Sequence, residues 1–325
     1  MQLLYLSRAE VEGLGVTMKD VLRVVEEGFR LKGLDQTEMP PKPGIHPRDN
    51  AFIHAMPAYV KGVEAAGVKW VSGYPSNLAK GLPYITGLLA LNDPETGIPI
   101  AVMDCAWITA MRTGASVGIA AKYLAKPNAT VVGFLGCGVQ ARTSLLALAE
   151  VLPSLREVRC LDVSMEATGR FIDEMSKWLP GLQFTVCQSP RDLATRCEVI
   201  TTAIPIVTQP EPPMEAGFLE QGALAVSLDY DSAWTTEAMR ECDRFVSDDI
   251  DQLMGTKAHH VYFAGIPSTI HADLGQICAK LKPGRQHDVE KIFAMNMGIA
   301  IDDIVTAKLL YERATAMGIG TKLPL

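Results

Sequence analysis

TVVGFLGCGVQARTSLLALAEVL, residues 130–152, joins an apolar run to a glycine-rich turn and then to a leucine-rich segment. The apolar run over 130–135 predicts a buried strand, and leucines at helical intervals predict a helix after the turn. Between them lies Gly136-Cys-Gly138-Val-Gln-Ala141. This is the GxGxxG/A pattern of dinucleotide binding, and it stands in the strand–turn–helix context that the pattern requires.

Each small residue of the turn has a physical task in that interpretation. Gly136 permits the tight turn, Gly138 lets a pyrophosphate approach the backbone, and Ala141 allows close packing of helix on strand. The phosphates would lie at the helix N-terminus, beside Val139 and Gln140, because free N–H groups and the helix dipole favour anions there. Glycine-rich turns also serve purely structural ends, so the next strand has to supply a check.

That check is Asp162, which lies at the end of the strand-like stretch in VRCLDV and is 21 residues after Ala141. A carboxylate at about this spacing accepts hydrogen bonds from the adenosine ribose. It would also repel a 2′-phosphate, and no Arg or Lys follows it before Arg170. We therefore expect NAD(H) as the cofactor, with NADP(H) disfavoured.

Alternating strand and helix signals continue through QFTVCQ, VITTAIP and ALAVSLDYD. This alternation predicts an α/β fold with a Rossmann-type doubly wound parallel sheet. Thr202 and Ala203 would stand at the carboxyl end of a strand, where ligands collect in such sheets. A polar strand end without a ligand explains the threonine equally well.

Length and composition narrow the class of protein. The chain has 325 residues, of which 48% are hydrophobic, enough for two domains. Its net charge of −7 and the absence of a Lys/Arg block argue against nucleic acid or a membrane surface as partner. The N-terminus lacks a signal-peptide pattern, which favours the cytoplasm. Seven cysteines without a CxxC motif favour reduced thiols over disulfides, and we expect no metal site.

The segment before the glycine-rich turn does not show the regular strand–helix alternation. Ser7 and Glu10 have capping-box spacing and Thr17 precedes a helical pattern, so residues 1–32 are expected to be helical. Residues 39–92 form short β-rich runs broken by Pro and Gly, which predict a mixed or antiparallel sheet. A helix over 107–126 follows, with a row of small residues that lets another backbone approach: Ala110, Gly114, Gly118 and Ala121.

Four charged residues stand in unexpected places. Lys69 lies inside the apolar strand VKWVSGYPSN, residues 68–77, where it either snorkels to water or serves a site. Arg112 lies on the predicted helix, where surface solvation is the ordinary explanation. Asp229 and Asp231 follow a strand, where they form either a solvated turn or a catalytic pair.

Several blocks together resemble the ornithine cyclodeaminase/μ-crystallin family. They are GVKWVSGYPSN, DPETGIPIAVMDCAWITAMRTGASVGIAAKYLA, GFLGCGVQAR and GIAIDDIVTAKLLYERATAMGIG, and they follow one another in order over nearly the whole chain. The resemblance implies a substrate-binding and dimerisation domain of α+β type over 1–127, completed by about 305–325. It implies an NAD(P)-binding Rossmann domain over 128–304, and a homodimer.

The resemblance also implies an activity. Members of this family bind NAD(H) or NADP(H) and transfer hydride to or from the Cα of an amino or imino acid. Lys69 and Arg112 match the family's binders of the substrate carboxylate, and Asp231, six residues before Glu237, matches its catalytic aspartate. Lys69 is also expected to take part in catalysis, and Thr113 to contact the cofactor.

Two departures from the family pattern bear on the substrate. His54 stands where ornithine cyclodeaminases carry a glutamate for the distal ammonium of the substrate, which argues against ornithine. Lys42 stands near the place of an additional arginine, with Arg48 as a less favoured alternative. His46 and His54 are equally explained as ordinary packing or turn residues.

Three functions therefore stand open. The first is an NAD(H)-dependent amino-acid dehydrogenase or imine reductase. The second is a cyclodeaminase-like ammonia lyase that returns its cofactor unchanged. The third is a nucleotide-dependent small-molecule binding protein of the μ-crystallin kind, against which Lys69, Arg112 and Asp231 together speak.

Overall fold

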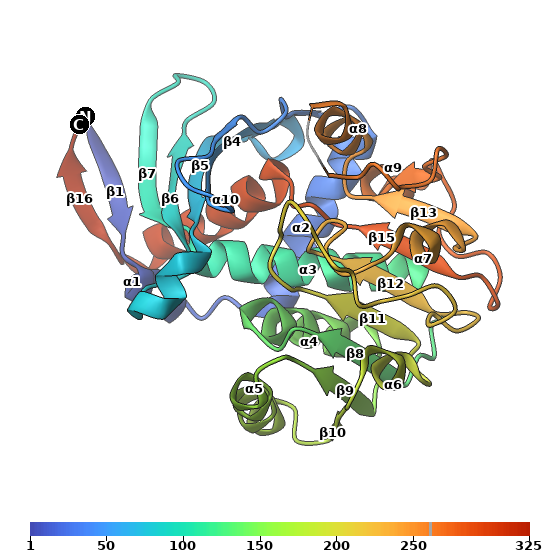
Figure 1. Ribbon diagram of the computed structural model, residues 1–325. Coiled ribbons are helices and arrows are strands. Elements are labelled where there is room, and N and C mark those ends of the chain that lie inside the picture. The colour runs from blue at the N-terminus through green and yellow to red at the C-terminus, as the bar shows by residue number, and fades with distance from the viewer. Residues whose placement is uncertain (260–261) are drawn as a thin grey trace. The chain divides into compact units, whose positions relative to one another are not determined.

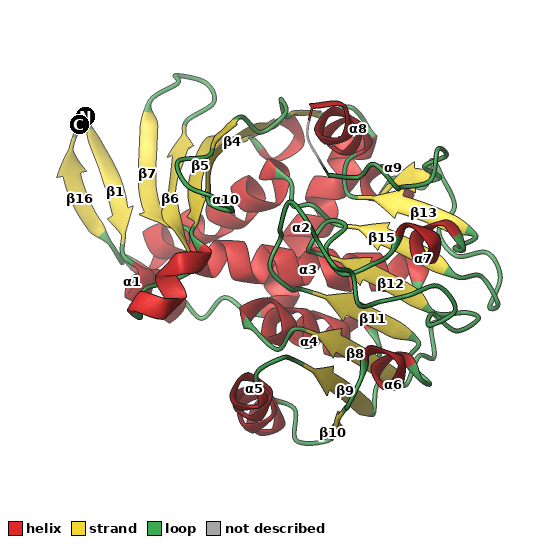
Figure 2. Ribbon diagram, viewed as in Figure 1, coloured by secondary structure: helices red, strands yellow, loops and turns green. Residues whose placement is uncertain are grey.

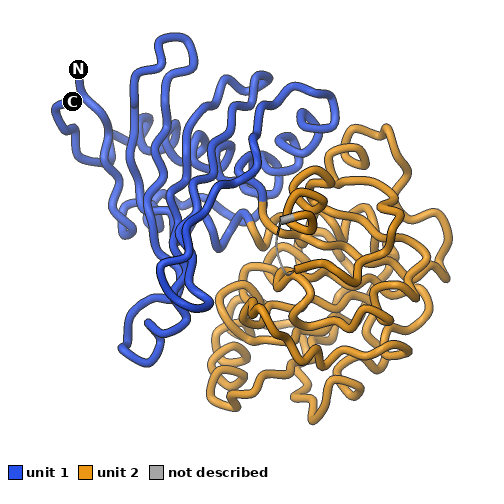
Figure 3. Tube along the Cα trace, turned by 45° about the horizontal axis from the view of Figure 1, so that its top comes forward, with its two compact units in different colours: residues 1–112, 299–325 blue, residues 113–298 orange. Residues whose placement is uncertain are grey.

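The computed structural model describes residues 1–259 and 262–325. The chain forms two compact units (Figure 3). Unit 1 comprises residues 1–112 and 299–325, and unit 2 comprises residues 113–298. Each unit is built around its own sheet (Figure 2).

Unit 2 contains a fully parallel sheet of eight strands in the order β10-β9-β8-β11-β12-β15-β13-β14. Figure 1 shows the strands from β10 to β13 stacked in this order from β10 upward. The strands are β8 (Val131–Leu135), β9 (Glu157–Leu161), β10 (Gln183–Val186), β11 (Val199–Thr202), β12 (Leu224–Ser227), β13 (Arg244–Ser247), β14 (Ala272–Asp273) and β15 (Ile292–Met295).

The strand order reverses direction between β8 and β11. Such a switch point leaves a crevice at the carboxyl ends of the strands, where ligands of open α/β sheets bind. The predicted doubly wound parallel sheet is confirmed. Because both faces of these strands are covered, β8, β11, β12 and β15 are buried along their whole length.

Helices connect these strands, and most begin with a side-chain cap. Ser164, Ser189, Thr235 and Asp273 each accept a hydrogen bond from the third backbone N–H of their helix. The helices are α4 (Val139–Val151), α5 (Met165–Trp178), α6 (Pro190–Ala194), α7 (Thr236–Arg240), α8 (Ile250–His259) and α9 (Leu274–Cys278).

Unit 1 contains a mixed sheet in the order β16-β1-β7-β6-β5-β4-β2, with β3 paired to β4. Only the β1–β7 pair is parallel in this sheet. The strands are β1 (Gln2–Leu6), β2 (Thr37–Glu38), β3 (Gly44–Ile45), β4 (Phe52–Val60), β5 (Ala65–Gly73), β6 (Ile85–Asn92), β7 (Pro99–Asp104) and β16 (Thr321–Pro324).

The expectation of helix throughout residues 1–32 was wrong for residues 2–6. They form β1, which pairs with β7 and with β16 near the end of the chain. Backbone pairing to two distant segments cannot be seen in local helical spacing. The capping boxes of Ser7 with Glu10 and of Thr17 with Asp20 are present, and they begin α1 (Arg8–Gly13) and α2 (Met18–Gly33).

Helix α10 (Ala300–Met317) packs on strands β4, β5 and β6 and on helix α2. Gly28 makes the helix contact close, because a Cβ there would lie 3.0 Å from the Ile301 side chain. Two short 3₁₀ helices, η1 (Lys61–Val63) and η2 (Pro75–Lys80), complete unit 1. None of the helices in the described part of the chain is long and apolar enough to cross a membrane.

Helix α3 (Ala106–Leu124) belongs to unit 1 up to Arg112 and to unit 2 from Thr113. The expected boundaries at 127 and 304 therefore differ from the observed ones at 112 and 298. The row of small residues explains the first difference: a Cβ on Gly114 would lie 2.4 Å from the backbone of Thr143 in α4. The seven cysteines, all in described segments, are free thiols, and only Cys242 is partly exposed.

Candidate active site

The glycine-rich turn connects β8 to α4 at the switch point of the sheet. Gly136 has a φ of +91°, and a Cβ there would lie 2.6 Å from the carbonyl oxygen of Ala203. Only glycine fits both restrictions. Gly138 differs, because a Cβ there would meet nothing within 4 Å. The turn therefore has open space at the position where a pyrophosphate would approach.

The N-terminus of α4 follows this open space. No side chain caps the helix at Gly138, and Val139 is exposed. The Oε1 atom of Gln140 is buried without a hydrogen-bond partner. Uncapped N–H groups at the start of a 13-residue helix favour an anion. The uncapped N–H groups and the open space at Gly138 fit the diphosphate of a dinucleotide, whereas the Gln140 oxygen is an acceptor and needs a hydrogen-bond donor.

Asp162 is the first residue after β9, and its carboxylate holds the turn in place. It accepts hydrogen bonds from the backbone N–H of Cys137 at 2.7 Å and of Ser164 at 2.8 Å. A carboxylate has further acceptor sites, so it can also bond to ribose hydroxyls. This second role was missed by the sequence analysis, which assigned Asp162 to the cofactor alone.

Thr202 and Asp229 form a buried network at the carboxyl ends of β11 and β12. The Asp229 carboxylate accepts hydrogen bonds from Thr202 Oγ1, Ser227 Oγ and the backbone N–H of Ile204. Thr202 Oγ1 in turn accepts from Trp234 Nε1. The hydroxyl proton of Thr202 is thus already used, and contact of its side chain with the cofactor stays a prediction. Burial raises the pKa of Asp229 to about 6 despite these hydrogen bonds.

Asp231 is separated from Asp229 by Tyr230, which has a φ of +59°. One oxygen of the Asp231 carboxylate accepts a hydrogen bond from the backbone N–H of Phe263 at 2.7 Å, while Oδ1 is buried without a partner. Phe263 also has a positive φ of 65° and is fully buried. Such left-handed backbone at bulky residues stores strain and is concentrated at functional sites. Asp231, rather than Asp229, therefore has a carboxylate oxygen available for chemistry.

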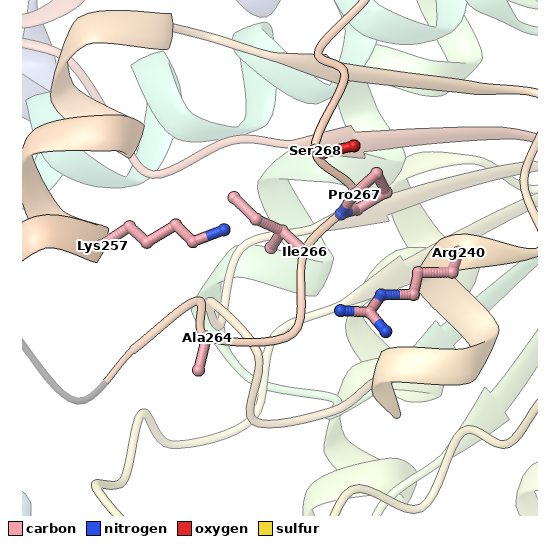
Figure 4. Close-up of a pocket in the computed structure, with 6 residues that line it drawn as sticks. All are labelled: Arg240, Lys257, Ala264, Ile266, Pro267 and Ser268. Carbon is pink, nitrogen blue, oxygen red and sulfur yellow. The ribbon is translucent and has the colours of Figure 1, made fainter.

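The segment after Phe263 is fixed by a close contact and a hydrogen bond. A Cβ on Gly265 would overlap the Thr236 side chain, and Arg240 Nε donates to the Gly265 carbonyl oxygen at 2.9 Å. Figure 4 shows the segment passing between Arg240 on α7 and Lys257 on α8. These two cations line a shallow hollow of about 360 Å³ together with Ala264, Ile266, Pro267 and Ser268.

Lys69 lies on β5 and is fully buried. Its neighbours across the sheet are Met56 on β4 and Leu89 on β6, so apolar side chains surround the stem. Its ammonium lies 2.7 Å from Oδ2 of Asp303 on α10. Burial and the nearby Arg112 lower the pKa of Lys69 to about 8, and Asp303 opposes that change. The snorkelling interpretation was wrong, because the ammonium does not reach water.

Arg112 lies at the same carboxylate. Its Nε atom is 3.0 Å from Oδ1 of Asp303, and Arg112 is only 6% exposed. The alternative of a solvated surface arginine was therefore wrong. Its Nη1 atom is buried without a hydrogen-bond partner. A guanidinium with an unused donor beside a buried ammonium is a suitable binder for a carboxylate.

Asp303 was missed by the sequence analysis. It lies in GIAIDDIVTAKLLYERATAMGIG, where the acidic pair looks like the polar face at the start of a helix. The apolar residues that flank the acidic pair in IDDIV were the only local sign that the pair is buried. The three charges Lys69, Arg112 and Asp303 come from segments far apart in the chain, and all lie in unit 1.

The remaining predicted substrate and cofactor residues are His54, Lys42 and Thr113. The register pairs His54 with Val71, so His54 is on the same face of the sheet as Lys69, and its ring stacks on Phe52. Lys42 is half-buried in the loop before β3. Thr113 is buried on α3 directly after Arg112. Contact of these three with substrate or cofactor stays a prediction.

Comparison with known proteins shows the family of the chain. A family model described as the ornithine cyclodeaminase/mu-crystallin family matches residues 2–318. The chain belongs to this family. An alanine dehydrogenase from Archaeoglobus fulgidus is 37% identical to it over 329 residues, which cover 99% of this chain and 98% of that protein.

Two solved structures are also similar to this chain. A Delta(1)-pyrroline-2-carboxylate reductase from Thermococcus litoralis, in complex with NADH and L-proline, has a TM-score of 0.88 and 35% identity, and covers 98% of this chain and 99% of its own. An archaeal alanine dehydrogenase dimer with bound NAD has a TM-score of 0.87 and 34% identity, and both chains are covered fully. The family resemblance drawn from the sequence is confirmed.

Proposed function

We propose that the protein is an NAD(H)-dependent oxidoreductase that transfers hydride to or from the Cα of an amino or imino acid. The observation that carries this proposal is the buried pair of cations, Lys69 and Arg112, with an unused guanidinium donor. The relatives named above act on an amino acid and an imino acid, and two of the solved structures contain NAD or NADH.

Each of the candidate site residues would have a separate role in binding or proton transfer. Arg112 and Lys69 would bind the carboxylate of the substrate and so fix its Cα. Asp231 Oδ1 would accept a proton from the α-ammonium in the oxidative direction and return it to nitrogen in the reductive one. The nicotinamide, when bound, supplies or accepts the hydride. His54 and Lys42 would contact the rest of the substrate.

A spectrophotometric screen tests this proposal. Purified protein with NADH or NADPH would be offered cyclic imines carrying a carboxylate, and 2-oxo acids with ammonia or amines. We expect NADH to be consumed with at least one member of these classes. Ammonia release from a diamino acid without net change of NADH would favour the cyclodeaminase, and binding without turnover would favour a carrier protein.

Gly138→Ala tests the nucleotide site separately from the fold. Because a Cβ at Gly138 meets nothing within 4 Å, we expect the melting temperature to stay at the wild-type value. The methyl group would occupy the space for the pyrophosphate, so the Kd for NADH should rise by roughly tenfold or more. Gly136→Ala is the matched control: its φ of +91° and its contact with Ala203 predict a lower melting temperature. Unchanged NADH binding by Gly138→Ala would place the pyrophosphate elsewhere.

Cofactor choice provides a second test. We expect kcat/KM with NADH to exceed that with NADPH, because the Asp162 carboxylate repels a 2′-phosphate. Asp162→Ser should narrow this preference, because it removes both the repulsion of the 2′-phosphate and an acceptor for the ribose hydroxyls. Since Asp162 also holds Cys137 N–H, some loss of affinity for both cofactors is expected. A wild-type preference for NADPH would contradict the assignment.

A homodimer in the cytoplasm completes the proposal. Trp70 on β5 and Leu88 on β6 are paired in register and each is 50% exposed, on the face of the sheet opposite Lys69. Large apolar side chains that are exposed in the single chain are typical of a surface that another protein chain contacts. A second copy is the expected cover, and an archaeal relative is a dimer. Free cysteines fit a reducing compartment.

A further inference from the structure

The Asp303 carboxylate contacts both Lys69 and Arg112, the two cations that would bind the carboxylate of the substrate. A negative charge at this position would be expected to repel a negatively charged substrate. The two oxygens of Asp303 lie 2.7 Å from Lys69 Nζ and 3.0 Å from Arg112 Nε, and its own side chain is fully buried. A carboxylate that only competed with the substrate would weaken binding. Before the substrate binds, however, the Asp303 carboxylate can stabilise the charges of the two cations.

Two buried cations side by side repel each other, and burial favours the neutral form of a lysine. Arginine stays charged in proteins, so Lys69 is the group that would lose its proton. An anion between them opposes both effects. With Asp303 present, the three groups carry a net charge of +1, which matches one substrate carboxylate.

We propose that Asp303 is a positioning residue that keeps Lys69 protonated beside Arg112, so that the two cations are ready for the substrate carboxylate. This inference rests on the proposed function. Among the described residues, the groups that act on the charge of Lys69 include one carboxylate, Asp303. Cys105 has its pKa raised to about 11 by burial and is a neutral thiol, while Met56 and Leu89 are apolar. The Asp104 carboxylate helps to raise the pKa of the Cys105 thiol, and Asp302 is the residue before Asp303 on α10.

The pH profile of kcat/KM tests the proposal. In the wild type, kcat/KM should fall as pH rises through about 8, where Lys69 loses its proton. Asp303→Asn removes the anion, so this alkaline limb should move to lower pH by about 1–3 units. Asp303→Glu keeps the charge, so it should keep the limb near its wild-type position even if the rate is lower.

Asp104→Asn is the matched control, because it removes a nearby carboxylate that caps the N–H of Ala106 and that no described ion pair joins to Lys69. It should leave the limb in place. A purely structural Asp303 would lower kcat/KM equally at every pH. The proposal is overturned if Asp303→Asn keeps the wild-type limb, or if Asp303→Glu shifts it as Asp303→Asn does.

A thermal unfolding cycle gives a readout without substrate. Asp303→Asn should lower the melting temperature, because it leaves two buried cations without an anion. Adding Lys69→Met to that variant should recover most of the loss, because one of those cations is then removed. Independent, additive losses would overturn the coupling of Asp303 to Lys69. This cycle gives its answer even if no amino or imino acid is turned over and the proposed function fails.

Discussion

Asp231→Asn should lower turnover by about 10²–10⁴-fold, the usual range for the loss of a general base. Asparagine keeps the size of the side chain, and its carbonyl oxygen can still accept the hydrogen bond from Phe263 N–H. It cannot take a proton at the position of Oδ1, the oxygen that has no partner in the structure. The Kd for NADH should be unchanged.

Asp229→Asn is the control for this variant, since it changes a carboxylate two residues away. Asp229 is fully buried and accepts three hydrogen bonds, including the backbone N–H of Ile204. An amide nitrogen facing a hydroxyl or an N–H group disturbs this network, so a lower melting temperature is expected. If Asp231→Asn turns over near the wild-type rate while folded Asp229→Asn is inactive, the acid–base role belongs to Asp229. If both are active, neither carboxylate is the proton acceptor.

From the sequence, Asp231 could be chosen over Asp229 as the proton acceptor only through the family resemblance. Both follow the same strand, and their spacing alone leaves either free for chemistry. The structure separates them through the left-handed conformation of Tyr230 and through the contacts of Thr202 and Phe263. Phe263 is more than thirty residues away in the chain, so no local pattern contains its hydrogen bond to Asp231.

Unit 2 was the most predictable part of the fold. Its strand, turn and helix are consecutive in the chain, and the special φ of Gly136 is visible as the glycine itself. Strand β1 and residue Asp303 were not predictable, because both depend on partners from the opposite end of the chain. Burial of Lys69 was suspected from its apolar neighbours, but its counter-ion could not be found from spacing.

Arg112→Ala is the second variant for which a large loss is expected. Removing one partner of a buried charge contact costs about 2–5 kcal/mol, so kcat/KM for the carboxylate substrate should fall roughly 30-fold to several thousand-fold. KM should rise because a binding group is lost. The value of kcat should also fall, because Lys69 alone is a point charge and cannot fix the orientation of the carboxylate as a planar guanidinium does.

Arg112→Lys separates charge from geometry in the same position. It keeps the cation beside Asp303 but not the forked donors, so we expect a loss between those of the wild type and Arg112→Ala. In Arg112→Ala, Lys69 loses its cationic neighbour and keeps Asp303, so its pKa should rise and the alkaline limb should move to higher pH. This direction is opposite to that expected for Asp303→Asn. An unchanged kcat/KM in folded Arg112→Ala would remove Arg112 from the substrate site and leave its contact with Asp303 as a structural ion pair.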